Sequence, residues 1–142
     1  MAIKIYKRNT AARRNMSIVK SPMITDKKPE KSLLSKRVRY AGRSGGKISV
    51  RHQGSGAKQR YRVIDFRQEK FKIPGRVVAI ERDPVRSAFI ALVHYTDGEK
   101  KYILAPEGLK AGQTILASEN APVKIGNRAK LKNIPVGTII SN

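Results

Sequence analysis

Apolar positions are dense only in the second part of the chain, from about residue 59 onward. There they form short runs of β-branched, aromatic and aliphatic residues, which are typical of β-strands. The strongest run, residues 88–95, is almost continuously apolar and indicates a strand that is buried on most of both faces. The pattern predicts strands at residues 61–66, 76–81, 88–95 and 101–105, and weaker ones at 114–116 and 136–140.

The connections between these runs are short and carry turn residues. Asp97-Gly98 lies between two of the strongest runs, and Asp-Gly is a leading signal for a type I′ hairpin turn. Asp83-Pro84 begins another turn. No long amphipathic helix intervenes, so a parallel βαβ arrangement is disfavoured. We therefore predict a mainly β fold with a small antiparallel barrel, and we favour the OB type over the SH3-like type.

Residues 1–58 show no sustained periodicity, and glycines interrupt their second half. Such a segment cannot bury enough apolar surface to offset its ordering entropy. We interpret residues 1–58 as a long, basic, extended N-terminal arm that orders on its partner, and residues 59–142 as the barrel domain. A disordered, solvated tail is the alternative. One short helix is predicted within the arm, near residues 30–36, with Pro29 as its first residue.

The charge is large and uneven. The chain has 31 Lys plus Arg and 10 Asp plus Glu, which gives a net charge of +21. Residues 1–72 carry 21 cations and 4 acids (+17), and residues 73–142 carry 10 and 6 (+4). This asymmetry indicates a polyanionic partner, of which nucleic acid is the commonest. The chain has no cysteine, and no apolar stretch approaches the ~20 residues that span a bilayer.

Catalytic chemistry is hard to assemble from these residues. The two histidines, His52 and His94, share no helical or strand spacing, so no metal site is expected. His94 ends an apolar strand and is interpreted as a structural residue with satisfied hydrogen bonds. Residues 42–47 resemble a phosphate loop, but Ile48 follows Lys47 where Ser or Thr is required. A phosphate-transfer enzyme is therefore disfavoured, and we predict no enzyme activity, no cofactor and no small-molecule substrate.

A basic, glycine-rich stretch at residues 43–62 has clearer chemistry. Glycines let backbone N–H groups approach phosphates, Lys and Arg supply charge, and His52 and Tyr61 offer ring faces on which an unstacked base can lie. The loop after the first barrel strand, and the turn before residue 88, add further cations at the expected binding side of an OB-type barrel. The alternative is a solvated basic linker. The candidate RNA-binding residues are Arg43, Lys47, Arg51, His52, Lys58, Arg60, Arg62, Arg67, Lys70 and Arg86.

Several spaced segments of the chain form a recognisable pattern. They are residues 1–7, 13–14, 29–34, 41–43, 47–48, 51–52, 61–66, 83–88, 95–106 and 133–137. Together they resemble the family of ribosomal protein two of the large subunit, the L-two family, in its bacterial or organellar form. The resemblance covers essentially the whole chain. It also places Arg67, Lys70 and Arg86 where the family has basic residues on its RNA-binding surface.

The resemblance implies an OB-type RNA-binding domain after an extended arm. It implies large-subunit ribosomal RNA and neighbouring ribosomal proteins as partners, without a membrane. It also implies a role in subunit assembly or association and in the peptidyl-transferase region. The expected location is the cytoplasmic ribosome, with a plastid or mitochondrial ribosome as the alternative.

The chain departs from the family pattern in two places. Residues 54–58 read Gly-Ser-Gly-Ala-Lys, where the family has three glycines followed by His-Lys. The family also continues into an SH3-like barrel and a basic tail beyond the part matched here, so nothing is carried over from those regions. The alternative function is a free single-strand RNA- or DNA-binding OB module of cold-shock type. It would present aromatic side chains on the barrel surface, whereas Tyr61, Phe89, Tyr95 and Tyr102 resemble core residues.

Overall fold

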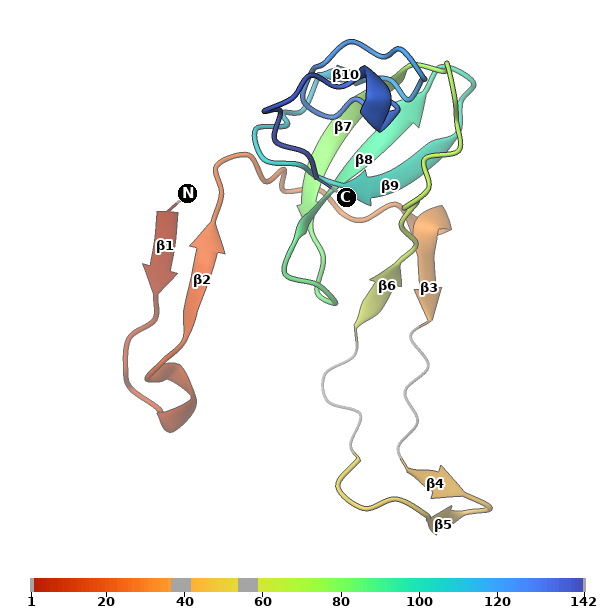
Figure 1. Cartoon of the computed structure of the whole chain (residues 1–142). Coiled ribbons are helices and arrows are strands. Elements are labelled where there is room, and N and C mark those ends of the chain that lie inside the picture. Colours follow the sequence, from red (N-terminus) through yellow and green to blue (C-terminus); the bar gives the residue numbers. More distant parts are fainter. Residues whose placement is uncertain (1, 37–41, 54–58, 142) are drawn as a thin grey trace.

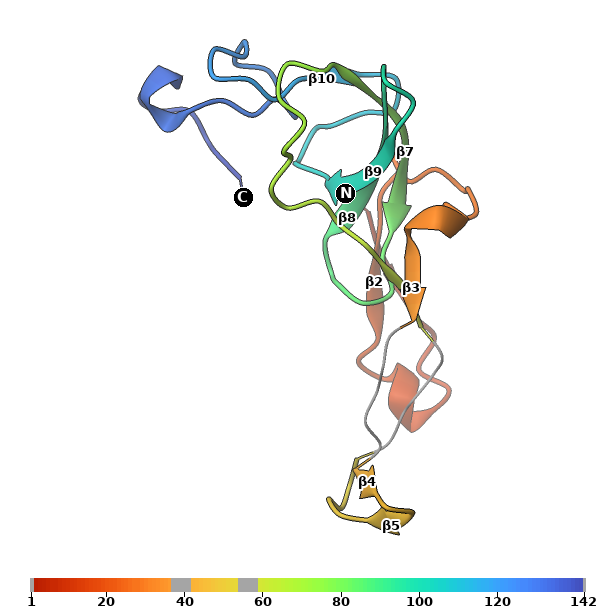
Figure 2. The ribbon, with the colours of Figure 1, turned by 90° about the vertical axis from the view of Figure 1, so that its right-hand side faces the viewer.

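The computed structural model describes residues 2–36, 42–53 and 59–141 of the chain. Within these ranges the regular structure consists of β-strands and short 3₁₀ helices, with no α-helix (Figures 1 and 2). The fold is therefore mainly β, as predicted. The 3₁₀ helices are Ala11–Arg13, Lys31–Leu33 and Leu131–Asn133.

A curled antiparallel sheet forms the body of the molecule and has the form of an OB-type barrel. Its strand order is β10-β7-β8-β9. The predicted strands in this region are confirmed, except at residues 136–140, where the prediction is wrong. Those residues form an exposed turn in which Val136 and Ile139 contact almost nothing. The strands of the sheet are β7 (Gly75–Arg82), β8 (Phe89–Tyr95), β9 (Lys100–Leu104) and β10 (Thr114–Ile115).

Both faces of this sheet are buried, which explains why β8 is apolar almost throughout. Two separate clusters result. The first cluster lies on one face and is formed by Val77, Ile80, Ala91, Val93, Tyr95, Ile103, Leu109 and Ile115. The second lies on the other face and is formed by Ile64, Ala79, Ile90, Leu92 and Tyr102, with Leu33 and Leu104 packed against it.

A β-bulge in β7 decides which side chains reach which face. Val77 pairs with Val93, but Ala79 pairs with Leu92, so Val78 is an extra residue in the ladder. An extra residue reverses the alternation of the strand beyond it. As a result Ile80 enters the first cluster, and the following residue, Glu81, is buried on the face of the second cluster.

The hairpin between β8 and β9 was predicted correctly, but its turn type was not. Only Gly98 of the Asp97-Gly98 pair has a positive φ, at +86°. The Gly98 N–H donates to the Tyr95 carbonyl at 3.0 Å, and the Tyr95 N–H donates to the Glu99 carbonyl at 2.9 Å. The turn is thus a three-residue loop with glycine in the left-handed region, and not a two-residue type I′ turn.

The N-terminal arm contains hairpins. β1 (Ala2–Ile5) pairs with β2 (Ser17–Lys20), and β4 (Arg43–Ser44) pairs with β5 (Lys47–Ile48). β3 (Leu34–Lys36) pairs with β6 (Arg60–Arg62), which is all that forms as a strand of the predicted run 61–66. Of the short helix predicted near residues 30–36, only one 3₁₀ turn forms, Lys31–Leu33, and it leads directly into β3.

Tyr102 joins the middle of this arm, at Glu30, to the barrel. Its side chain is fully buried, and its hydroxyl donates to Glu81 Oε2 at 2.9 Å and accepts from the Glu30 N–H at 3.0 Å. Burial raises the pKa of the Tyr102 phenol to about 12 and also raises the pKa of the Glu81 carboxyl. Close by, the Thr25 N–H donates to the Ile80 carbonyl at 2.8 Å. Residues 25–33 are thereby attached to β7 and to the second cluster.

We expect Tyr102→Phe to lower the free energy of unfolding by about 1–3 kcal/mol, because it leaves the buried Glu81 carboxyl and the Glu30 N–H without a partner. Urea unfolding of the full chain measures this loss. Tyr6→Phe, in the β1–β2 hairpin, is the matched control and should leave stability unchanged. Equal stability of wild type and Tyr102→Phe would show that the hydroxyl does not hold the arm.

Glu81→Gln should change how stability depends on pH. The folded carboxyl holds its proton more tightly than the unfolded one, so the wild-type free energy of unfolding falls as the pH rises above about 4.5 and through the raised pKa. Glutamine has no proton to lose and should remove this decline. Urea unfolding at pH 4.5, 6 and 7.5 and constant ionic strength measures the difference between the two proteins. A difference that is constant with pH would contradict the burial of an ionisable group here.

Candidate nucleic-acid interface

The segment from residue 31 to residue 62, here called the hairpin arm, carries ten Lys or Arg and no Asp or Glu. It comprises β3, β6 and the β4–β5 hairpin, which lies beyond them and away from the barrel (Figures 1 and 2). In the described residues, every cation in an ion pair lies outside the hairpin arm. These paired cations are Arg67, Lys70, Arg86, Lys100, Lys101 and Lys130.

Glycines build the far end of the hairpin arm. Gly45 and Gly46 have φ values of +56° and +76°, which suits a two-residue type I′ turn between β4 and β5. The Gly42 carbonyl accepts from the Ser49 and Val50 N–H groups at 2.7 and 2.9 Å. A Cβ at Gly42 would lie 2.3 Å from the Val50 carbonyl oxygen, so no other residue fits. These glycines therefore shape a tight turn.

That turn leaves the predicted cations of the tip open to solvent. Arg43 and Lys47 lie on β4 and β5 on either side of the turn, and both are exposed. Arg51 and His52 follow β5, are also exposed, and His52 has a φ of +60°. The predicted residue Lys58 lies outside the described residues. The structure thus brings four of the predicted residues together at one exposed end.

The β3–β6 pair places like charges opposite one another. Lys36 pairs directly with Arg60 across the two strands, and both are exposed. Like charges in directly opposed positions destabilise a strand pair, so an anion between them would stabilise it. Lys36 was not among the predicted residues, because nothing in the local sequence shows which strand will pair with it. Arg62 is different: it is partly buried, and its charge lowers the pKa of Glu81 against the effect of burial.

Arg86 holds together the turn before β8. Its guanidinium lies 3.0 Å from the carboxylate of Asp83, whose side chain is fully buried. It also lies over the rings of Tyr61 and Phe66, 5.6 and 5.9 Å from their centroids. One face of the Tyr61 ring, which the sequence offered as a stacking surface for a base, therefore carries Arg86. The contacts of Arg86 in this structure are internal to the chain.

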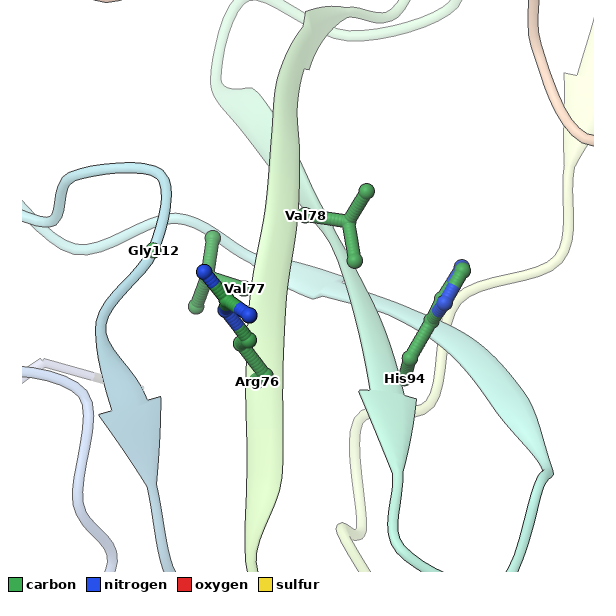
Figure 3. Close-up of a pocket in the computed structure, with 5 residues that line it drawn as sticks. All are labelled: Arg76, Val77, Val78, His94 and Gly112. Carbon is green, nitrogen blue, oxygen red and sulfur yellow. The ribbon is translucent and has the colours of Figure 1, made fainter.

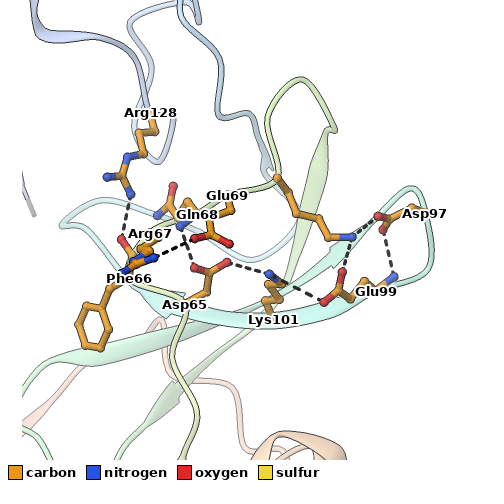
Figure 4. A network of polar contacts seen from close by, with 10 residues as sticks. Asp65, Phe66, Arg67, Gln68, Glu69, Asp97, Glu99, Lys101 and Arg128 are labelled. Carbon is orange, nitrogen blue, oxygen red and sulfur yellow. Dashed lines mark hydrogen bonds and ion pairs between the residues drawn. The ribbon is translucent and has the colours of Figure 1, made fainter.

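The loop between β6 and β7 contains a network of paired charges (Figure 4). Lys70 is bonded to Asp97 and Glu99, and these bonds raise the pKa of its ammonium group. Lys101 lies 3.2 Å from Asp65, and Arg67 lies 3.4 Å from Glu69. Arg67 is well exposed, so a phosphate could replace its partner with little rearrangement. The ammonium of Lys70, by contrast, is occupied by two carboxylates.

No helix in the described part of the chain is long and apolar enough to cross a membrane. Among the same residues, no three His, Cys, Asp or Glu side chains are grouped so that they could hold a metal ion.

Arg86→Ala and Arg43→Ala should separate a structural cation from a binding one. Removing Arg86 leaves the Asp83 carboxylate buried without its counter-ion, so we expect a loss of about 2–3 kcal/mol in the free energy of unfolding. Arg43→Ala removes an exposed side chain and should not change stability. Thermal unfolding of both variants measures the contrast. If Arg86→Ala were as stable as wild type, Arg86 would be available as a free RNA contact.

A comparison with protein families finds the same chemistry. The family described as "Ribosomal Proteins L2, RNA binding N-terminal domain" matches residues 30–117. The match begins at Glu30, whose N–H donates to the Tyr102 hydroxyl. It includes the hairpin arm and ends just after β10. It therefore contains the cations of the hairpin arm, which form no ion pair among the described residues, and the sheet that holds the arm. Since the match spans more than half of the chain, the protein belongs to this ribosomal protein family, whose members are structural, RNA-binding components of the ribosome.

Proposed function

We propose that the chain is a structural constituent of the large ribosomal subunit and that its hairpin arm binds large-subunit ribosomal RNA. The observation that carries the proposal is the ten cations and no acids of residues 31–62. Outside this segment, described cations such as Lys70, Arg86 and Lys101 are paired with carboxylates. A folded RNA supplies the negative charge that the hairpin arm lacks.

The contacts divide into two groups in this proposal. Exposed cations of the hairpin arm lie against phosphates, and the His52 ring is open to a base. Lys58 and Arg67 extend the same surface on sequence grounds. Arg62, Lys70 and Arg86 act mainly within the chain, by fixing the base of the arm and the loops beside it. The proposed phosphate contacts are Lys36, Arg43, Lys47, Arg51 and Arg60.

The separation of RNA-contacting cations from structural ones also suggests a role for the protein in the ribosome. A long basic hairpin on a rigid sheet can reach between RNA helices while the barrel packs at their surface. We therefore propose that the protein supports assembly or association of the subunits and order around the peptidyl-transferase region, in the cytoplasmic ribosome and beside other ribosomal proteins. In domain terms, residues 1–58 form the RNA-binding arm and residues 59–142 the barrel domain.

A free single-strand-binding module is less well supported. That function uses aromatic rings exposed on adjacent barrel strands. Here Tyr95 and Tyr102 are buried in the two clusters, and Phe89 packs against the first. Phe66 and Phe71 are exposed, but they lie in the loop between β6 and β7.

The salt dependence of RNA binding tests the proposal. A triple variant, Arg43→Gln, Lys47→Gln and Arg51→Gln, removes three phosphate contacts and should reduce the slope of log K against log[salt] by about 2–3. Wild-type affinity for a large-subunit rRNA transcript should therefore fall about 40-fold more than that of the variant between 50 and 200 mM salt. Filter binding at four salt concentrations measures both slopes.

The matched control neutralises three exposed cations outside the hairpin arm, as Lys110→Gln, Lys124→Gln and Lys132→Gln. It changes the net charge equally and should keep the wild-type slope. A small-subunit rRNA transcript should bind both proteins more weakly than the large-subunit one. If the two triple variants lost the same slope, binding would be non-specific attraction to net charge, and the hairpin arm would not be the interface.

A further inference from the structure

A separate cation without a partner lies on the barrel itself. Arg76, on β7, is exposed, and its side chain makes no ion pair or hydrogen bond with any described residue. It pairs directly with His94 on β8, so both side chains emerge on the same face of the sheet. Val78, the extra residue of the β-bulge, lies between them (Figure 3). With Val77 and Gly112, these residues line an open recess of about 310 Å³.

His94 differs from what its sequence position predicted. It was expected to be a structural histidine with satisfied hydrogen bonds, but its Nε2 is buried and bonds to no group in the described part of the chain. A buried polar atom of this kind usually has a partner. The rest of the imidazole is partly exposed and lines the recess.

The surroundings of His94 are positively charged. Burial lowers the pKa of its imidazole, and the charges of Lys100 and Lys27 lower it further, while Glu30 acts in the opposite direction. Lys100 is paired with Glu30 at 3.2 Å, whereas Lys27 has no such partner in the described residues. Near neutral pH the ring is thus uncharged, with a polar edge and an apolar face, and cations lie around it.

We propose that the recess formed by Arg76, Val78 and His94 holds one unpaired nucleotide of the bound ribosomal RNA. Arg76 binds its phosphate, and the sugar or base lies against Val78 and the His94 ring. This proposal rests on the proposed function and adds a second contact to it. Unpaired nucleotides are the parts of RNA that proteins hold in this way, by charge, ring contact and edge hydrogen bonds.

The size and position of the recess favour a nucleotide. Its volume is near the lower end of the range of about 300–1,000 Å³ that is typical of small-molecule pockets, too small for a helix and suited to a single residue of RNA. It lies beside β10, since Arg76 also pairs with Thr114, and so at the end of the barrel away from the β4–β5 hairpin (Figure 1). RNA bound at both places would run along the length of the molecule.

Arg76→Gln tests the proposal, because Arg76 is exposed and its loss should not affect folding. Against the large-subunit rRNA transcript, we expect a roughly tenfold loss of affinity, as for one charged hydrogen bond, and a salt slope lower by about 0.7, as for one contact with a single strand. Lys124→Gln is the matched control and should bind like the wild type. Unchanged affinity and slope in Arg76→Gln would overturn the proposal.

The His94 ring supplies a local readout. Its imidazole signals, assigned by comparison with His52→Gln, are followed by NMR while a 12-nucleotide oligouridylate is added to the full chain. We expect saturable shifts of the His94 signals, and roughly tenfold weaker binding in Arg76→Gln. Signals that do not move, or that move only with a hexaglutamate peptide, would overturn the proposal; the second result would point to an acidic protein partner.

The two proposals fail in different ways. Suppose that the triple variant of the hairpin arm shows a smaller slope of log K against log[salt] while Arg76→Gln does not. The arm then binds RNA and the recess takes no part in the binding. If neither differs from its control, the interface proposed for the hairpin arm is wrong, and the nucleotide site falls with it.

Discussion

The buried hydroxyl of Tyr102 is the constraint on which the rest of the structure depends. It bonds to the Glu81 carboxyl and to the Glu30 N–H, while the Tyr102 carbonyl accepts from the Asp65 N–H at 2.8 Å. Polar groups removed from water must be satisfied by one another, so none of these segments can move without leaving a buried partner unpaired. Both ends of the hairpin arm, before residue 31 and after residue 62, therefore leave the barrel at a defined place.

Because the barrel holds the arm in place, one chain can contain both cations paired with carboxylates and cations that face one another without acidic partners. In the barrel, several cations are paired with carboxylates, as Arg86 is with buried Asp83 and Lys101 is with Asp65. In the hairpin arm they repel one another, as Lys36 and Arg60 do across β3 and β6. A two-stranded hairpin is marginal in water even without such repulsion. The hairpin arm is held by the barrel at one end, and in the proposed complex the RNA would neutralise the charges along its length.

Local sequence patterns predict the strands of the barrel, but they do not predict the strand pairing in the arm. Strands β7, β8 and β9 were predicted because burial on one or both faces leaves a periodic or continuous apolar signal. The pairing of β3 with β6 leaves no such signal, since it joins segments more than twenty residues apart and buries little. The bulge at Val78 could not be predicted either. Because the residues from Val77 to Ile80 are all apolar, the sequence does not show which of them is the extra residue of the strand.

The candidate site shows the same division. Charge asymmetry was enough to indicate a nucleic-acid partner, but a cation's role depends on its neighbours in space. Arg86 and Arg43 are the same residue type in the same predicted surface. Arg86 neutralises a buried carboxylate, and Arg43 has no carboxylate partner among the residues that the structure describes. Arg76 was overlooked because its neighbours in sequence are apolar, and only the register that sets it opposite His94 shows that it lines a recess. In a protein this basic, a cation therefore indicates a binding site only where the fold leaves it without a carboxylate.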